Sequence, residues 1–176
     1  MSGARSRGQS WPGRFQSFVR SVSGWYRGLA VASDGETVSQ HGAAPKWILI
    51  ADDDALVREL WAEALTGAGF RVLEANTGRE TLDILRAVVP DLLLLDLHMP
   101  ALSGEDVLVR LRAIAALQSL PVLIISGFLE NEPEAGRGLN IVGRLTKPQP
   151  VSALVAAVQE AVQRSRPVSP VIRLTR

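Results

Sequence analysis

The segment DLLLLDLHMPALSG, residues 91–104, decides the fold class of this chain. Four leucines stand between Asp91 and Asp96, so this stretch has no side chain suited to face water. A strand that is apolar on both of its faces is typical of the centre of a parallel sheet covered by helices. The segment therefore predicts a buried central strand over residues 91–96 that ends in a carboxylate.

The sequence on either side of this segment alternates between short apolar runs and amphipathic stretches. Further strands are predicted at residues 47–51, 71–75, 121–126 and 141–146. Helices are predicted at residues 54–67, between Thr77 and Pro90, at residues 104–117 and at residues 151–164. Because parallel strands need crossover connections, five strands that alternate with helices predict a doubly wound α/β domain.

Two of these helices have apolar faces that we expect to be buried. A further helix, between the fourth and fifth strands, is only weakly indicated by the sequence. The inward residues of the helix at 54–67 are predicted to be Leu56, Leu60, Trp61, Ala64 and Leu65. Those of the last helix are predicted to be Ala153, Leu154, Ala157, Val158, Ala161 and Val162. Between residues 130 and 139, one proline and two glycines leave room only for a short, irregular fourth helix.

The composition excludes several classes of protein. The 176 residues include no cysteine, which rules out disulfides, thiolate metal sites and thiol nucleophiles. The formal charge of +1 hides an asymmetry, because residues 1–45 and 165–176 are basic while the stretch between them has 11 basic and 16 acidic residues. An acidic core argues against direct nucleic-acid binding, and the lack of cysteine fits a cytoplasmic location.

We place the folded domain at residues 46–164 and expect both ends of the chain to be disordered. Residues 1–45 are a basic extension, rich in Gly, Ser and Arg, that shows no strand pattern. Aromatic and aliphatic residues recur at helical spacing over residues 11–29, which permits an amphipathic helix for a membrane surface or a partner groove. Three glycines weaken that helix, so disorder is the favoured interpretation, as it is for the tail at residues 165–176.

Polar residues stand where the predicted strands end. They are Asp52, Asp53 and Asp54 after the first strand, Asp96 after the third, Ser126 after the fourth and Lys147 after the fifth. Ligands of open parallel sheets bind beyond the carboxyl ends of the strands, so these side chains are expected to meet. Carboxylates in a cluster repel one another, and a divalent cation such as Mg²⁺ is the common remedy.

This set of side chains suits phosphoryl transfer. Mg²⁺ takes one or two protein carboxylates besides water and phosphoryl oxygens, and Asp53 and Asp96 can supply them. Asp96 is then available as a nucleophile, while Lys147 and Ser126 can bind the remaining phosphoryl oxygens. Each residue alone would be an ordinary surface or strand-end residue, so the chemistry is indicated by the constellation.

Residues 46–164 resemble the receiver (response regulator) domain of two-component signalling systems. The motifs that carry the resemblance are IADDD at 50–54, DLLLLDLHMPALSG at 91–104, LPVLIISG at 120–127 and LTKP at 145–148. The resemblance implies a flavodoxin-like fold with strand order 2-1-3-4-5. It also implies a bacterial, stand-alone signalling phosphoprotein that is not an enzyme in the ordinary sense, although it assists its own phosphorylation and slow dephosphorylation.

The resemblance assigns roles to residues around the phosphorylation site. Asp96 is expected to accept the phosphoryl group and to bind Mg²⁺ or Mn²⁺, together with Asp53. The backbone carbonyl of His98 is expected to be a further metal ligand, and Asp52 is expected to bind the metal through water. The side chain of His98 is expected to face solvent or to make local contacts only.

Four further positions follow from the same resemblance. Ser126 and Lys147 are expected to contact the phosphoryl group, Gly104 is expected to have a structural role, and the bond from Lys147 to Pro148 is expected to be cis. Arg144 departs from the family, which usually has an aromatic residue there, so the coupling of that residue to Ser126 is in doubt. Phe128, two residues past Ser126, predicts slow self-dephosphorylation through restricted access of water.

The expected phosphodonor is a histidine kinase or a histidine phosphotransfer protein, and the output is expected to pass through protein contacts with an unknown downstream partner. By resemblance, the responsive surface consists of the fourth helix, the fifth strand and the fifth helix. Two alternatives stay open. One is a pseudo-receiver adaptor that works without phosphorylation. The other is a cobalamin-binding domain, because Asp96-Leu97-His98 is half of its signature, although Ala101 stands in its glycine position.

Overall fold

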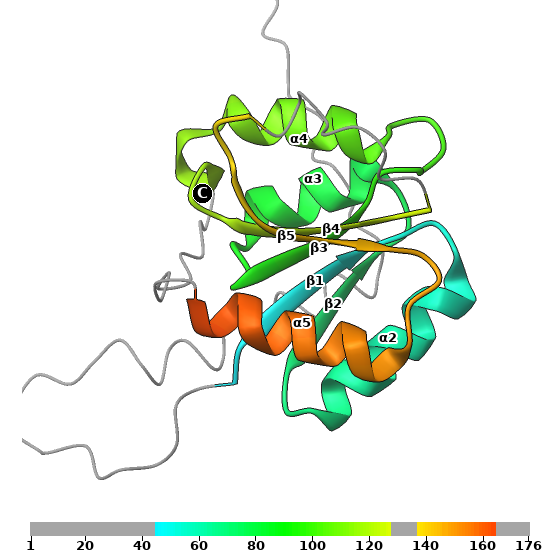
Figure 1. Ribbon diagram of the computed structural model, residues 1–176. Coiled ribbons are helices and arrows are strands. Elements are labelled where there is room, and N and C mark those ends of the chain that lie inside the picture. Colours follow the sequence, from blue (N-terminus) through cyan, green and yellow to red (C-terminus); the bar gives the residue numbers. More distant parts are fainter. Residues whose placement is uncertain (1–44, 128–136, 165–176) are drawn as a thin grey trace, which may run out of the picture. The chain divides into compact units, whose positions relative to one another are not determined.

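The computed structural model describes residues 45–127 and 137–164 of the chain (Figure 1). Two predictions therefore fall outside the described residues, apart from residue 45. They are the disorder of residues 1–45 and 165–176 and the amphipathic helix at residues 11–29. Most of the region of the weak fourth helix also lies outside them, and so does Phe128. No helix among the described residues is long and apolar enough to cross a bilayer.

Five parallel strands form one sheet, as the sequence predicts. They are β1 (Trp47–Ala51), β2 (Arg71–Ala75), β3 (Leu92–Asp96), β4 (Pro121–Ser126) and β5 (Asn140–Thr146). Their order in the sheet is β2-β1-β3-β4-β5, which confirms the doubly wound α/β class and the expected strand order (Figure 1). All five residues of β3 are buried, because this strand lies in the middle of the sheet.

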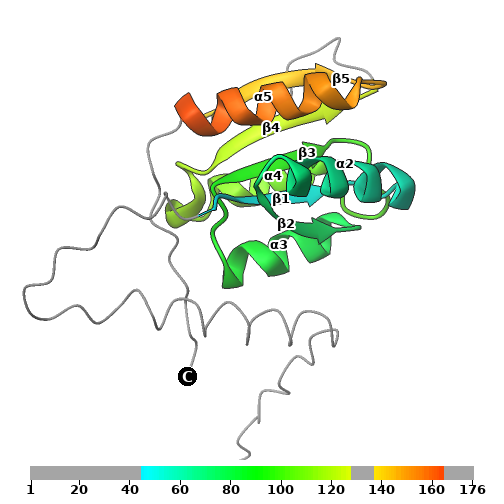
Figure 2. The same ribbon diagram turned by 90° about the horizontal axis from the view of Figure 1, so that it is seen from below.

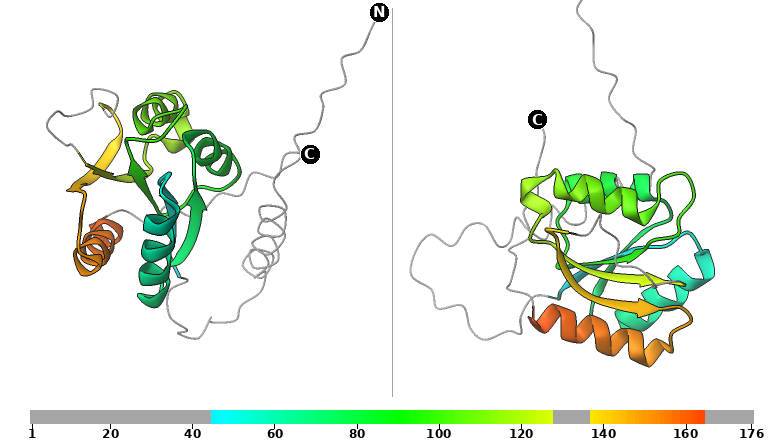
Figure 3. Two further views of the ribbon diagram at one scale, coloured as in Figure 1. Left: turned by 90° about the vertical axis from the view of Figure 1, so that its right-hand side faces the viewer. Right: turned by 45° about the horizontal axis from the view of Figure 1, so that its top comes forward.

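Helices cover both faces of the sheet. The helices are α2 (Ala55–Gly67), α3 (Gly78–Ala87), α4 (Gly104–Arg112) and α5 (Val151–Arg164). Figures 2 and 3 show α2 and α5 side by side on one face, with α3 and α4 on the other. Since both faces are covered, the central strands have buried side chains on both faces of the sheet.

The face toward α2 and α5 shows how the core is assembled. Alternate strand residues point toward these helices and pack with them in one cluster of buried residues: Ile48, Ile50, Trp61, Leu65, Leu92, Leu94, Leu123, Ile125, Leu154, Val158 and Ala161. In the last helix Leu154, Val158 and Ala161 are therefore buried, while Ala153, Ala157 and Val162 are half-buried. The predicted inward face of this helix is confirmed.

Two details of the helices differ from the sequence prediction. Leu56 and Leu60 were expected on the buried face of α2, but they are 77% and 50% exposed. The residues of this helix that are buried are Trp61 and Leu65, which lie one turn apart and face the sheet. Leu56 and Leu60 are also one turn apart, but this pair is rotated by about 140° around the helix from the pair of Trp61 and Leu65.

The helix predicted at residues 104–117 ends at Arg112 and is followed by a 3₁₀ turn at Ala115–Leu117. A continuous α-helix would place Leu117 about 120° around the helix axis from Leu111, away from the buried row of this helix. The break puts both leucines in the core, with exposures of 2% or less. Burial of a second leucine explains why the chain leaves the α-helix early.

Candidate functional site

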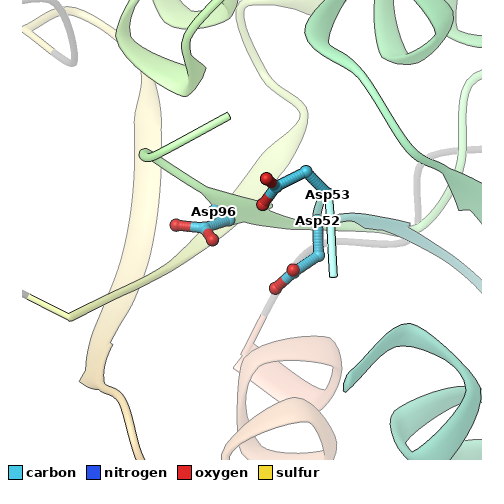
Figure 4. Close-up of side chains that lie close together, drawn as sticks. All are labelled: Asp52, Asp53 and Asp96. Atoms are coloured by element: carbon cyan, nitrogen blue, oxygen red, sulfur yellow. The ribbon is translucent and has the colours of Figure 1, made fainter. Parts of the chain in front are cut away.

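The polar residues at the carboxyl ends of the strands converge on one site, as expected. Asp52 follows β1, and Asp96 ends β3. Together with Asp53 they bring three carboxylates so close that one oxygen of each lies within 4.8 Å of the others (Figure 4). The sheet topology is responsible, because β1 and β3 are neighbours that run in the same direction.

Asp96 is only 3% exposed, and each of its carboxylate oxygens has a hydrogen-bond donor. Lys147 Nζ donates to Oδ2 over 2.5 Å, and the backbone N–H of His98 donates to Oδ1 over 2.9 Å. The carboxylate is therefore held in one orientation at the end of β3. Both oxygens of this buried side chain are thus fixed at the carboxyl edge of the sheet.

Asp52 is completely buried, whereas its neighbour Asp53 is exposed. Lys147 Nζ donates to Asp52 Oδ2 over 2.5 Å, and the backbone N–H of Asp54 donates to Oδ1 over 3.0 Å. Burial raises the pKa of Asp52 above its ordinary value, although both of these donors act to lower it. Burial wins, so the ionised form of Asp52 is disfavoured in the folded protein relative to the unfolded chain.

Lys147 lies between the two buried carboxylates and bonds both. Burial on its own would lower the pKa of Lys147, but the hydrogen bonds to Asp52 and Asp96 outweigh it and raise the pKa above the ordinary value. The ammonium also lies 5.5 Å from the centre of the Trp61 ring, within the range of a cation–π contact. Lys147 supplies one positive charge to a cluster of three carboxylates, which leaves the cluster negative.

Ser126, at the end of β4, is completely buried. Its Oγ lies 2.8 Å from Nδ1 of His98, and its carbonyl accepts the backbone N–H of Lys147 over 2.8 Å. The expectation that the His98 side chain makes only local contacts is wrong, because this bond joins residues 28 positions apart. His98 is nevertheless exposed, as predicted.

Two backbone features shape the site. A Cβ atom on Gly104 would collide with the carbonyl of Asp96 and with the backbone of Leu97, so only glycine fits at the start of α4. The Lys147–Pro148 peptide bond is cis, as the family resemblance led us to expect. Arg144, in place of the usual aromatic residue, lies exposed on β5.

Two supports of the site were missed from the sequence. The loop after Asp96 contains a γ-turn, in which the N–H of Leu102 donates to the carbonyl of Pro100 over 2.8 Å and Ala101 has φ 64°. Arg58 Nη1 donates to the carbonyl of Asp52 over 2.7 Å. A glycine or asparagine at position 101 would have signalled the turn, but alanine gives no such signal.

The family model of the response regulator receiver domain matches residues 48–159, so the chain belongs to the response regulator receiver domain family. It is 31% identical to the transcriptional regulatory protein PdtaR of Mycobacterium tuberculosis over 137 residues, which are 77% of this chain and 65% of PdtaR. It is 34% identical over 124 residues to the response regulator MprA of Mycolicibacterium vanbaalenii, covering 70% of this chain and 53% of MprA. The chain thus spans less than two thirds of these relatives.

Solved structures agree with this family. A putative response regulator from Chloroflexus aurantiacus is 30% identical, with a TM-score of 0.62 over 69% of this chain and 100% of that one. The chemotaxis response regulator CheY4 of Vibrio cholerae also has a TM-score of 0.62, over 67% of this chain and 99% of its own. At 24% identity, the second likeness supports the fold alone.

Proposed function

We propose that this protein is a phospho-accepting response regulator in which Asp96 takes a phosphoryl group from a histidine kinase or a histidine phosphotransfer protein. The observation that carries the proposal is the pair of bonds from Lys147 to Asp52 and Asp96, inside a cluster of three carboxylates. A structural ion pair needs one acid. Two buried acids around one ammonium, with an exposed third acid beside them, suit a site that binds a cation and accepts a charged group.

The chemistry proposed for Asp96 is nucleophilic attack on phosphorus. One carboxylate oxygen forms the new O–P bond while the P–N bond to the histidine of the donor breaks, and its electron pair leaves with the imidazole. Lys147 neutralises charge on Asp96 and is placed to bind a phosphoryl oxygen. Ser126, at the end of the neighbouring strand, is proposed to donate its hydroxyl to another phosphoryl oxygen.

The donor set also fits Mg²⁺, which prefers hard oxygen ligands and one or two carboxylates. The three acids have oxygens close enough for one ion, and Asp53 is exposed where water can enter. We expect Asp53, Asp96 and the carbonyl of His98 to hold the metal directly and Asp52 to hold it through water. The ion would neutralise the excess negative charge of the acids and of the phosphoryl group.

The surface beside the site suits a protein donor. Leu56 and Leu60 are exposed on α2, the helix that begins directly after the acidic residues. Exposed leucines one turn apart offer an apolar row on which a helix of another protein can pack.

We further propose that the protein works in the cytoplasm and signals through protein contacts, with neither direct nucleic-acid contact nor membrane contact.

Neither alternative function accounts for the site as well. In a cobalamin-binding domain Lys147 and the acidic cluster would have no role, and the family match is to receivers. A pseudo-receiver adaptor is suggested by Arg144, which is exposed on β5, and by the weak fourth helix predicted from the sequence, most of which lies outside the described residues. It would not need Asp52, Asp96 and Lys147 to be bonded together in a buried site.

Phosphorylation by acetyl phosphate with Mg²⁺, read by intact mass, tests the proposal. Wild type is expected to gain one phosphoryl group, and Asp96→Asn is expected to gain none. Asp91→Asn, which changes an aspartate just before the same strand, is the matched control and is expected to behave as wild type. An adduct on Asp96→Asn, or none on folded wild type together with no binding of beryllofluoride, would contradict the proposed phosphoryl acceptance.

A further inference from the structure

Four residues of the site are joined in a closed ring of hydrogen bonds. Asp96 Oδ1 accepts the N–H of His98 over 2.9 Å, and His98 Nδ1 lies 2.8 Å from Ser126 Oγ. The carbonyl of Ser126 accepts the N–H of Lys147 over 2.8 Å, and Lys147 Nζ donates to Asp96 Oδ2 over 2.5 Å. The ring links the carboxyl ends of β3 and β4 to the chain that follows β5, and His98 is the member that nothing so far explains.

We infer that the imidazole of His98 is a positioning residue for the Ser126 hydroxyl: it holds that hydroxyl while Asp96 is unmodified and competes for it with a phosphoryl group on Asp96. This inference rests on the proposed phosphoryl acceptance of Asp96 and adds a regulator of that same site. His98 thereby sets how readily the phosphorylated arrangement forms.

The competition follows from the chemistry of a buried serine. Ser126 is fully buried and has one side-chain torsion, so its oxygen occupies one of three staggered positions. The position in this structure lies 2.8 Å from His98 Nδ1. The hydroxyl has a single proton, and if Nδ1 accepts that proton, a phosphoryl oxygen cannot receive it. If Nδ1 carries a proton and donates instead, the bond still fixes the oxygen, and rotation toward a phosphoryl group breaks it.

The position of the bonding atom in the imidazole suggests a matched pair of variants. Nδ1 of histidine is two bonds from Cβ, as are Oδ1 and Nδ2 of asparagine, so His98→Asn can restore the bond. His98→Leu places methyl groups there and cannot form a hydrogen bond. Because His98 is exposed, neither change opens a cavity in the core. The pair therefore separates the hydrogen bond from the mere presence of a side chain.

The binding of beryllofluoride with Mg²⁺, a non-covalent mimic of the phosphoryl group, is the measurement. His98→Leu lacks the hydrogen bond that opposes binding, so this variant is expected to bind beryllofluoride about 2- to 10-fold more tightly than wild type. His98→Asn is expected to return to the wild-type affinity. In a Ser126→Ala background, which lacks the hydroxyl, His98→Leu is expected to change nothing further.

The outcomes distinguish this inference from the function on which it rests. Wild type that binds no beryllofluoride would overturn both. Wild type that binds, with His98→Leu binding equally or more weakly, would overturn the inference alone. The inference would also fail if His98→Leu tightened binding by the same factor with and without the Ser126 hydroxyl, since the effect would then not pass through Ser126.

Discussion

The two ends of the sheet each hold a lysine bonded to aspartate, and they are built differently. At the amino end, Lys46 Nζ donates to Asp91 Oδ1 over 2.9 Å, and the N–H of Trp47 donates to Oδ2 of the same carboxylate over 2.9 Å. At the carboxyl end, Lys147 bonds the two buried carboxylates of Asp52 and Asp96. The same pair of residue types thus occurs at both ends, with one acid at the first and two at the second.

The difference separates an ordinary ion pair from the proposed phosphoryl-accepting site. At the amino end one cation meets one anion, both oxygens of Asp91 have donors, and the Lys46 side chain is 35% exposed. This pair ties the start of β1 to the start of β3. At the carboxyl end the negative charge exceeds the positive charge and is buried, which opposes folding. Charge clusters of this kind are more frequent at functional sites than elsewhere, which supports the proposed phosphoryl acceptance of Asp96.

Replacing the two lysines by alanine is expected to reveal the largest difference. Lys147→Ala leaves two buried carboxylates without their cation, and we expect the free energy of unfolding to fall by about 3 kcal/mol in metal-free buffer. Lys46→Ala removes a half-buried partner of Asp91, whose other oxygen keeps its backbone donor, and is expected to cost at most about 1 kcal/mol. Urea unfolding measures both. The raised pKa of Lys147 means that its stabilisation is full below pH 10.5 and is lost as the pH rises through the folded-state value.

Equal losses for the two lysine variants would contradict the contrast between the ends. Mg²⁺ provides a control, since a cation among the carboxylates is expected to restore part of the stability of Lys147→Ala. It is expected to have no such effect on Lys46→Ala beyond the effect on wild type.

Removing Asp91 is expected to have a medium effect on stability and none on the chemistry. Asp91→Ala loses the ion pair to Lys46 and leaves the N–H of Trp47 without this acceptor, which together should cost about 1–2 kcal/mol. Phosphorylation by acetyl phosphate is expected to match wild type under conditions where the variant is folded. A loss of phosphoryl acceptance in the folded variant would show that the two ends are not independent.

Neutralising Asp52 is expected to have the smallest effect and the opposite sign. Burial raises the pKa of Asp52 above 3.8, so the folded protein binds this proton more tightly than the unfolded chain, and stability falls as Asp52 ionises with rising pH. Asp52→Asn removes that loss, and near neutral pH we expect a gain of about 1 kcal/mol in metal-free buffer. The gain should grow from pH 3.8 up to the raised pKa and stay constant above it.

Thermal or urea unfolding of Asp52→Asn across this pH range provides the measurement. Glu63→Gln is the control, because it also neutralises an acid, but one that is exposed on α2. It is expected to give no gain in stability. A stability loss in Asp52→Asn at neutral pH would mean that the bond to Lys147 outweighs the burial of the charge.

Much of the fold and site could be predicted because local patterns were unambiguous. The uniform leucines before Asp96 identified the central strand, and the strand-end acids identified the metal-binding candidates. Local patterns failed where packing chose between similar options. The sequence does not tell which of two rows of α2 faces the sheet, and it does not show that breaking the helix after Arg112 buries Leu117.

By itself, the sequence determined the class of the fold, the order of strands and helices, and the residue types gathered at the carboxyl edge. These follow from periodicity and from the rule that parallel strands end at a common edge. Only the tertiary structure decided that Lys147 bonds both Asp52 and Asp96 and that the imidazole of His98 reaches Ser126. Those contacts depend on distances of a few ångströms between separate strands, and no spacing along the chain encodes them.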